Sequence, residues 1–428
     1  MNKLKYILCI VLVTLSVPRG AMASELCGLP GIEEMELVSE AAFLLDRGTG
    51  KVLYETNADL LLYPASTTKI MTALILLENA RLNEIIVVGE EINRIGYDSS
   101  TAKLKVGDRL TVADMVYALM LPSGNDAAYS TAVFVARRVS GFELMEIDQA
   151  VALFTEMMNQ RAKELGATHT NFAGPDGYHC PEHVSTARDL ALITQAALEQ
   201  KFLCQVVSAK DYYWQDKRWI NTNRMLSQDY PDEYYPWATG FKTGYTPQAG
   251  NCFVFTASGG GRDLLGVTLN APKGRIWRDA RTLLEYGFGA WQYYAMLVEG
   301  RQIFSVPIRG QRRGQPDMLQ ILAGGTYSDL HHVADIRRLE LDFEWTQGVV
   351  QSDEPGLVLK APIQEGQVLG LAVICLDGEK LAEVEMVAAY GVEAYSWLLP
   401  ASAIALGSAI VLLLIILGKG KSKPAVTF

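Results

Sequence analysis

Cysteine is scarce in this 428-residue chain, and positive charge is not in excess. Of the six cysteines, Cys9 falls in an N-terminal segment that we expect to be removed, so an odd number remains. These are Cys27, Cys180, Cys204, Cys252 and Cys375. Because they have no regular spacing and at least one is unpaired, the chain is not a disulfide scaffold. The formal net charge of −10 argues against nucleic acid as a partner.

Internal repeats and low-complexity tracts are lacking too. Hydrophobic residues make up 49% of the chain and charged residues 20%, which is typical of a folded protein rather than a disordered one. The length allows two or three domains and a substantial hydrophobic core.

The N-terminus carries a pattern typical of secretion. Lys3 and Lys5 precede a short apolar run. The small residues Ala21 and Ala23 occupy the positions that a signal peptidase recognises before its cleavage site. We therefore predict a cleaved signal peptide over residues 1–23, with an uncleaved anchor as the alternative.

The C-terminus carries a pattern typical of a membrane span. Residues 398–417 contain no charge, and this length suffices to cross a bilayer. Lysines follow within a few residues, as they do on the cytoplasmic side of membrane helices. We therefore predict a transmembrane anchor over residues 392–418 and a cytoplasmic tail over residues 419–428. The protein would lie in the cell membrane with a single C-terminal span and its body outside the cytoplasm; a buried core helix is the alternative.

Hydrophobic periodicity predicts the elements between these ends. Strands are expected at residues 42–46, 51–55, 212–214, 241–243, 251–257 and 264–269. Helices are expected from about residue 66 and at residues 111–121, 127–138, 147–165, 186–200 and 283–296. Thr111, followed by Asp114 three residues later, predicts a capping box at one helix start.

This order of elements predicts an α+β fold. Hairpins near both ends of a helical middle favour one antiparallel sheet closed by strands far apart in sequence. Residues 24–299 would then form a domain with helices on both faces of the sheet and a helical subdomain. Short apolar runs separated by turns predict a small all-β domain over residues 300–391, which we interpret as a spacer or interaction module.

Ser66 and Lys69 stand at the expected start of an apolar helix. Residues three apart lie on one helical face, so the hydroxyl and the amine can come within hydrogen-bond reach. An alcohol is a weak nucleophile that needs a base, and a lysine can be that base where burial lowers its pKa. Taken alone, the pattern occurs by chance in many chains and more often marks a helix cap beside a solvated lysine.

Two further motifs follow in order, Ser123-Gly124-Asn125 in a loop and Lys242-Thr243-Gly244 on a strand. Apart from Gly124 in place of Asp, the trio is the mark of penicillin-binding proteins and class A β-lactamases. Acyl transfer from a peptide needs a nucleophile, a base, a proton donor to the leaving amine and an oxyanion site. We predict Ser66 as nucleophile, Lys69 as base and Ser123 as proton donor.

The other motif positions are predicted to hold the substrate. These are Asn125, Lys242, Thr243, Gly244 and Tyr245. Lys242 would attract an anionic substrate and disfavour protonation of Lys69, and Thr243 would bind a carboxylate. Gly244 would let the substrate backbone approach, and the backbone N–H groups of Ser66 and Tyr245 would form the oxyanion hole. The expected substrate is a peptide with a free terminal carboxylate.

Over roughly residues 38–296 the chain resembles the D-alanyl-D-alanine carboxypeptidases among the low-molecular-mass penicillin-binding proteins. The extended motifs that carry the resemblance span residues 64–69, 122–128, 185–189 and 240–246. The resemblance implies a β-lactamase/transpeptidase-like fold and removal of the terminal D-alanine from peptidoglycan stem pentapeptides through an acyl-enzyme, in cell wall biogenesis. It also implies that no metal or cofactor is needed and that β-lactam antibiotics act as acylating inhibitors.

The chain departs from the family's pattern in two places, and a third residue lies near a position that the family uses. Many relatives end in an amphipathic surface helix, whereas this tail is long enough to span. Tyr245 stands where well-known members carry a histidine. Arg262 lies near the position at which the family places an arginine for the substrate carboxylate.

Three alternative functions share parts of this pattern. Class A β-lactamases use a glutamate to activate the deacylating water, but between Asn125 and Lys242 no Glu is followed four residues later by Asn. A D,D-endopeptidase would carry the same motifs, so it stays open. A catalytically dead wall-binding protein is disfavoured because all three motifs are intact.

A cluster of metal-binding residue types lies outside the motifs. His179, Cys180 and His183 follow Asp176 in a Gly- and Pro-bearing stretch, and Cys and His at such spacing can bind zinc. No second ligand pair accompanies them. A surface loop is therefore the better interpretation.

Overall fold

The computed structural model describes residues 35–350, 357–395 and 410–415. The chain divides between Gln292 and Tyr293 into two compact units. The predicted signal peptide, residues 1–23, lies outside the described residues. The predicted domain limits at residues 24, 299, 300 and 391 stay predictions.

The first unit is built on a five-stranded antiparallel sheet of strand order β2-β1-β9-β8-β7. The strands are β1 (Ala41–Asp46), β2 (Val52–Thr56), β7 (Ala238–Thr246), β8 (Gly250–Gly259) and β9 (Arg262–Ala271). The expected hairpin of β1 and β2 is formed, and Ala41 pairs with Leu269. Strands from opposite ends of this unit's sequence therefore close the sheet, as the order of elements predicts.

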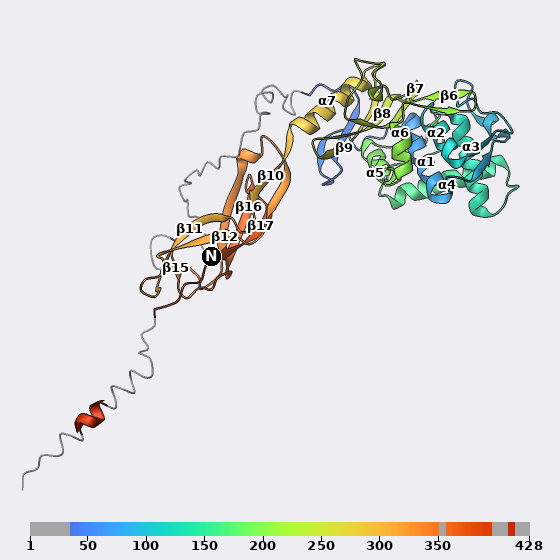
Figure 1. Ribbon diagram of the computed structural model, residues 1–428. Helices are drawn as coiled ribbons and strands as arrows, with labels where there is room; N and C mark the ends of the chain where they lie inside the picture. Colours follow the sequence, from blue (N-terminus) through green and yellow to red (C-terminus); the bar gives the residue numbers. More distant parts are fainter. Residues whose placement is uncertain (1–34, 351–356, 396–409, 416–428) are drawn as a thin grey trace, which may run out of the picture. The chain divides into compact units, whose positions relative to one another are not determined.

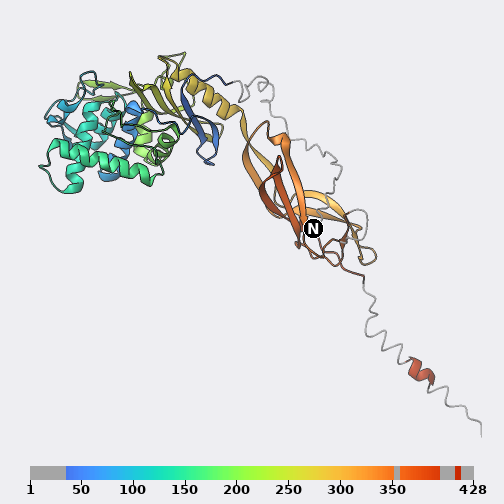
Figure 2. The ribbon, with the colours of Figure 1, turned by 180° about the vertical axis from the view of Figure 1, so that it is seen from behind.

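Side chains alternate between the two faces of this sheet. Phe43 and Leu45 on β1 join the core formed with the helical part of the unit. Leu44 points the other way, and a Cβ added to Gly287 of α7 (Ile276–Gly289) would lie 2.9 Å from it. Helices thus cover both faces. Figures 1 and 2 show α7 beside β8 and β9, and a larger group of helices apart from α7, which includes α1 (Lys69–Asn79), α3 (Asn125–Ser140) and α4 (Ile147–Glu164).

The helices of the larger group follow the predicted order with small shifts. They are η2 (Ala65–Thr68), α1 (Lys69–Asn79), η3 (Glu90–Arg94), α2 (Val112–Met120), α3 (Asn125–Ser140), α4 (Ile147–Glu164), α5 (Ala187–Leu198), α6 (Lys201–Ser208) and η4 (Arg224–Leu226). Thr111 and Asp114 form the expected capping box at α2. Short two-stranded pairs are β3 (Ile85–Val87) with β4 (Arg109–Thr111), and β5 (Asp211–Trp214) with β6 (Lys217–Ile220).

The prediction of a helix over residues 283–296 is wrong at both ends. The observed α7 begins earlier, at Ile276, after a turn at Pro272. It ends at Gly289, and β10 (Trp291–Leu297) follows and pairs with β13 (Tyr327–His332). The aromatic residues of β10 suit a strand, and a partner strand later in the chain decides the outcome.

The second unit is a β structure with its own core. Its six-stranded sheet has the order β14-β16-β17-β12-β11-β15. The strands are β11 (Gln302–Arg309), β12 (Met318–Ala323), β14 (Leu339–Trp345), β15 (Leu359–Lys360), β16 (Val368–Leu376) and β17 (Glu379–Ala388), and η5 (Ile336–Arg338) precedes β14. In β14 the apolar residues, among them Leu341 and Phe343, alternate with exposed acidic ones, so one face meets the core.

The predicted fold class needs one correction. No helix in the described part of the chain is long and apolar enough to cross a membrane, so the transmembrane helix expected over residues 392–418 is not part of the observed architecture. Of that segment, residues 392–395 and 410–415 are described, and only the latter are helical. The other residues of the segment and the predicted tail, 419–428, lie outside the described residues.

Candidate active site

The three motifs come from separate elements of the first unit and meet around Lys69. Ser66 lies in η2 and Lys69 is the first residue of α1. Ser123 stands between α2 and α3, and Asn125 is the first residue of α3. The Lys242-Thr243-Gly244-Tyr245 segment lies on β7, which forms one edge of the sheet.

The Ser66–Lys69 pair depends on the tight first turn. Side chains three residues apart eclipse each other in a 3-10 helix, and η2 has this geometry. The Lys69 Nζ atom lies 2.9 Å from the Ser66 Oγ atom. The predicted approach of hydroxyl and amine is present, and it arises from a 3-10 turn that leads into the α-helix.

Lys69 is fully buried and makes two further contacts. Its Nζ donates to Asn125 Oδ1 and to the backbone carbonyl of Asp176, both at 2.7 Å. Burial lowers the pKa of Lys69 to about 8, against the opposing effect of the Asp176 and Asp126 carboxylates. A minor fraction of Lys69 is therefore neutral near physiological pH, whereas an ordinary lysine is almost entirely charged there.

Ser123 has a strained backbone and a buried hydroxyl group. Its φ is +61°, in the left-handed region that few non-glycine residues adopt. The backbone carbonyl accepts a 2.6 Å hydrogen bond from Ser100 Oγ, which holds the peptide in place. The Ser123 Oγ atom is buried and has no hydrogen-bond partner among the described residues. Strain and an unsatisfied hydroxyl together are typical of a functional position.

Lys242 and Thr243 lie side by side on β7. Lys242 is buried, and its Nζ donates to the Thr243 carbonyl at 2.9 Å. Burial, followed by the charge of Lys69, holds the pKa of Lys242 well below its ordinary value. The Thr243 hydroxyl lies 2.6 Å from the hydroxyl of Thr222. The hydroxyl groups of Thr222 and Thr243 therefore lie next to each other at the edge strand β7.

Gly244 and Tyr245 complete the motif. A Cβ added to Gly244 would lie 2.9 Å from the backbone nitrogen of Ser66. The lack of a side chain at Gly244 therefore lets the backbone of Ser66 come close to β7. The predicted role is different, namely to let the backbone of a substrate approach. Tyr245 is 61% exposed.

Several residues around the site have a role that the sequence does not predict. Ser99 accepts a hydrogen bond from Asn125 Nδ2 at 2.8 Å, so it orients the amide that meets Lys69. Asp176 meets Lys69 through its backbone, and Thr222 meets Thr243. These residues sit in loops without a recognisable motif. Their roles depend on the tertiary packing.

The residues considered for zinc have other contacts. The Cys180 thiol donates to Glu182 Oε2 at 2.8 Å, and His183 Nε2 lies 2.8 Å from Thr68 Oγ1. The His179 ring packs edge-on against Tyr63. No group of three or more metal-ligating side chains is found within the described ranges.

Arg262 has a structural place. Its guanidinium donates to the carbonyls of Gly287 and Phe288, at 2.8 and 2.7 Å, at the end of α7. On the sheet Arg262 pairs with Gly259, whereas Lys242 pairs with Val254. At about 3.3 Å per residue this separates the two positions by roughly 17 Å along the strands. The suggested role of Arg262 at the substrate carboxylate is therefore not supported.

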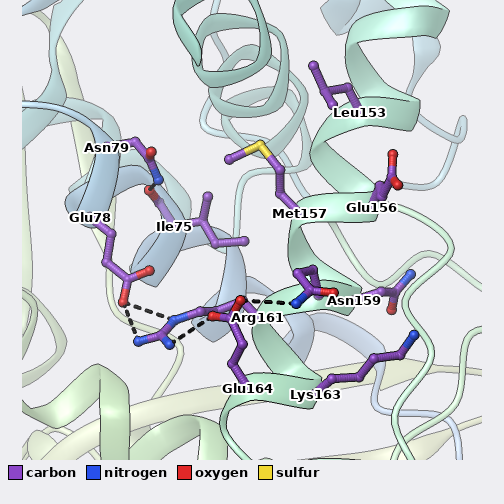
Figure 3. Close-up of a pocket in the computed structure, with 11 residues that line it drawn as sticks. Ile75, Glu78, Asn79, Leu153, Glu156, Met157, Asn159, Arg161, Lys163 and Glu164 are labelled. Atoms are coloured by element: carbon purple, nitrogen blue, oxygen red, sulfur yellow. Dashed lines mark hydrogen bonds and ion pairs between the residues drawn. The ribbon is translucent and has the colours of Figure 1, made fainter. Parts of the chain in front are cut away.

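A groove of about 560 Å³ lies elsewhere in this unit, between α1 and α4. Figure 3 shows Arg161 of α4 reaching Glu78 of α1, with a 2.8 Å contact between Nη2 and Oε1. Glu78 lies near the end of α1, whereas Lys69 begins it. The ion pair joins the two helices, and the groove is distinct from the catalytic motifs.

A serine hydroxyl beside a buried amine, with the two further motifs around it, fits the class of serine enzymes that transfer acyl groups. Residues 30–273 match the peptidase S11 family, described as D-alanyl-D-alanine carboxypeptidase. The D-alanyl-D-alanine carboxypeptidase DacF of Bacillus subtilis is 29% identical over 398 residues, which cover 90% of this chain and 92% of the relative. DacC of Escherichia coli is 28% identical over 380 residues, covering 85% and 86%.

Solved structures agree with this match. Penicillin-binding protein 5 from Haemophilus influenzae superposes with a TM-score of 0.59 at 26% identity, over 85% of this chain and all of the other. The Streptomyces K15 DD-transpeptidase gives 0.55 at 32% identity, over 59% of this chain and 98% of the other. The chain belongs to the D-alanyl-D-alanine carboxypeptidase family, and the predicted serine-type carboxypeptidase function is confirmed at the level of this family.

Proposed function

We propose that Ser66 forms the acyl-enzyme and that Lys69 is its general base. The contacts of Lys69 carry this proposal. A neutral amine has two N–H donors and one lone pair. The oxygens of Asn125 and Asp176, each 2.7 Å from Nζ, accept hydrogen bonds from the two N–H groups. The lone pair is then directed to the Ser66 hydroxyl group, whose Oγ lies 2.9 Å from Nζ. This arrangement supports proton transfer to Lys69 as Ser66 attacks the scissile carbonyl carbon.

The leaving group needs a proton when the C–N bond breaks, and we assign its delivery to Ser123. The Ser123 Oγ atom is buried without a partner in the described part of the chain. An unpaired buried hydroxyl is costly, so a substrate group that hydrogen-bonds to it gains affinity there. The backbone N–H groups of Ser66 and Tyr245 are the proposed oxyanion hole, where negative charge develops on the carbonyl oxygen.

The substrate's terminal carboxylate is proposed to bind at Lys242 and Thr243. The Thr243 and Thr222 hydroxyl groups, 2.6 Å apart, would donate hydrogen bonds to the carboxylate, and its negative charge would favour the protonated form of the buried Lys242. The edge position of β7 supports an extended peptide that pairs with the strand. Asn125, already bonded to Lys69, is proposed to hold a substrate amide through its side chain.

The proposed substrate is a peptidoglycan stem pentapeptide ending in D-Ala-D-Ala. Attack by Ser66 releases the terminal D-alanine, and water then hydrolyses the ester. A β-lactam would acylate the same serine, and the resulting acyl-enzyme would hydrolyse slowly. We place this reaction outside the cytoplasm, where the cell wall lies, and regard the second unit as a spacer or interaction module.

Acylation by a fluorescent penicillin tests the proposal. The purified chain and Ser66→Ala are incubated with the drug and separated by denaturing electrophoresis. A stable label on the parent protein alone, followed by D-alanine release from a pentapeptide, supports it. An unlabelled parent that hydrolyses the drug rapidly would indicate a β-lactamase, and an unlabelled parent with intact drug would refute the assignment of Ser66. Cleavage of cross-linked dimers in place of D-alanine release would indicate an endopeptidase.

A further inference from the structure

The peptide bond between Ala65 and Ser66 is held by its carbonyl oxygen. Ala65 has a φ of +50°, an unusual conformation for a residue with a side chain. The Thr68 hydroxyl donates to the Ala65 carbonyl at 2.8 Å. Gly177 also packs against this carbonyl, since a Cβ there would lie 1.9 Å from the oxygen. The strained conformation before the nucleophile is therefore restrained from outside its own turn.

His183 determines the direction of the hydrogen bond made by Thr68. The backbone N–H of Ala173 donates to His183 Nδ1 at 3.0 Å, so Nδ1 carries no proton. The neutral ring must then carry its proton on Nε2, which lies 2.8 Å from Thr68 Oγ1. Because Thr68 accepts from His183, its own hydroxyl proton is left for the Ala65 carbonyl. The chain of hydrogen bonds runs in one direction, from Ala173 to Ala65.

His183 is suited to this fixed role. It is 3% exposed, and burial, with the charges of Lys69 and His179, lowers its pKa to about 4. The ring therefore stays neutral at the pH of most cellular compartments. A charged ring would carry a proton on Nδ1 as well, which would oppose the N–H of Ala173.

The carbonyl and the N–H of a trans peptide point in opposite directions. Fixing the Ala65 carbonyl therefore fixes the direction of the Ser66 N–H, whose nitrogen packs against Gly244 of β7. We propose that His183 and Thr68 are positioning residues that aim the Ser66 N–H into the oxyanion hole. This inference rests on the proposed function, in which that N–H binds the developing oxyanion.

The test compares Thr68→Val, which removes the hydroxyl at nearly constant shape, with Thr68→Ser, which keeps it. A misdirected Ser66 N–H should stabilise the transition state of acylation less well. We expect the acylation rate of Thr68→Val to fall by about 10- to 100-fold, since loss of a whole oxyanion donor costs about 10²–10³. Thr68→Ser should stay within about threefold of the parent. The acid limb of the pH–rate profile, which reports Lys69, should not move in either variant.

Infrared spectroscopy provides a signature that a merely structural role would not produce. Oxyanion-hole donors weaken the ester carbonyl of the acyl-enzyme, so a β-lactam with a ¹³C-labelled carbonyl should give a band at higher wavenumber in Thr68→Val than in the parent. His183→Gln, which retains an N–H near the Nε2 position, should preserve more of the parent rate than Thr68→Val.

The outcomes separate the two proposals. A parent that is never acylated overturns the proposed function, and this inference falls with it. A parent that is acylated, with Thr68→Val equally fast and an unshifted ester band, overturns the inference alone. If Thr68→Val unfolds at the assay temperature, His183→Gln is compared with the parent instead. A His183→Gln acyl-enzyme with an unshifted ester band, formed more slowly than that of Thr68→Ser, would contradict positioning by His183.

Discussion

The side-chain nitrogen of Lys69 donates a 2.7 Å hydrogen bond to the backbone carbonyl of Asp176, a residue 107 positions later in the chain. The Asp176 side chain is buried as well, and its Oδ2 atom has no hydrogen-bond partner among the described residues. Burial raises the pKa of Asp176, while Lys69 nearby lowers it. The proposed base therefore lies beside a buried carboxyl group whose charge opposes its deprotonation.

The acylation rate should depend on the protonation of Lys69. Burial lowers the pKa of Lys69 to about 8, so the amine is a cation below that pH and a base above it. We expect the second-order rate of acylation by a penicillin to rise about tenfold per pH unit below 8 and to level off above it. Stopped-time labelling between pH 6 and 9.5 measures this. A flat profile through pH 8 would remove Lys69 from the role of base.

Asp176→Asn should shift that profile to lower pH. The Asp176 carboxylate raises the pKa of Lys69, so removing its charge at constant shape should make Lys69 easier to deprotonate. At pH 6.5 the variant should be acylated faster than the parent, and the two should agree above the pKa. An acid limb that stays in place, in a variant of parental thermal stability, would show that the carboxyl is uncharged or without influence on Lys69.

Gly177→Ala should lose acylation, and Gly50→Ala is the matched control. Both glycines have positive φ, +80° and +73°, so both variants incur a backbone cost of about 1 kcal/mol. A Cβ at Gly50 meets nothing within 4 Å, whereas at Gly177 it would collide with the Ala65 carbonyl. We expect a loss of acylation of more than about tenfold for Gly177→Ala alone. Equal labelling of the two variants would contradict the restraint on Ala65.

Thr222→Val should weaken recognition of the terminal carboxylate. The Thr222 hydroxyl lies 2.6 Å from that of Thr243, so its loss removes one hydrogen bond from the proposed carboxylate site. The expected cost of about 1 kcal/mol corresponds to a roughly fivefold higher KM, and Thr222→Ser should restore affinity. A peptide whose terminal carboxylate is amidated should not distinguish parent from variant. If the amidated peptide shows the same difference, Thr222 acts on the fold and not on the carboxylate.

The buried His183 should make the protein less stable in mild acid. Its folded pKa of about 4 lies below the ordinary value of 6.5, so between these pH values the unfolded chain binds a proton that the folded chain does not. Stability from this residue is complete above pH 6.5 and is lost as the pH falls towards 4, by up to about 3 kcal/mol. Urea unfolding of the parent and of His183→Gln at pH 7 and 4.5 measures it. The loss should be smaller in the variant, and equal losses would contradict the prediction.

Local signals predicted the elements whose geometry depends on nearby residues. The pair Thr111 and Asp114 forms its capping box within one turn, and β1 and β2 meet across a short turn. The i,i+3 spacing of Ser66 and Lys69 likewise suffices to bring hydroxyl and amine together. In each case the interacting groups lie a few residues apart, so backbone geometry alone limits where they can be.

The tertiary structure decided the rest. The amino-acid order alone determined the residue types of the three motifs and the local turn that joins Ser66 to Lys69. It did not reveal that Asp176 and Asn125 would accept hydrogen bonds from Lys69 or that His183 would reach Thr68. Nor did it reveal that residues 291–297 would form β10 and pair with β13 instead of continuing a helix. These contacts join residues up to 115 positions apart. Their formation depends on how the whole unit packs, because burial and partner choice are properties of the folded core and not of any short segment.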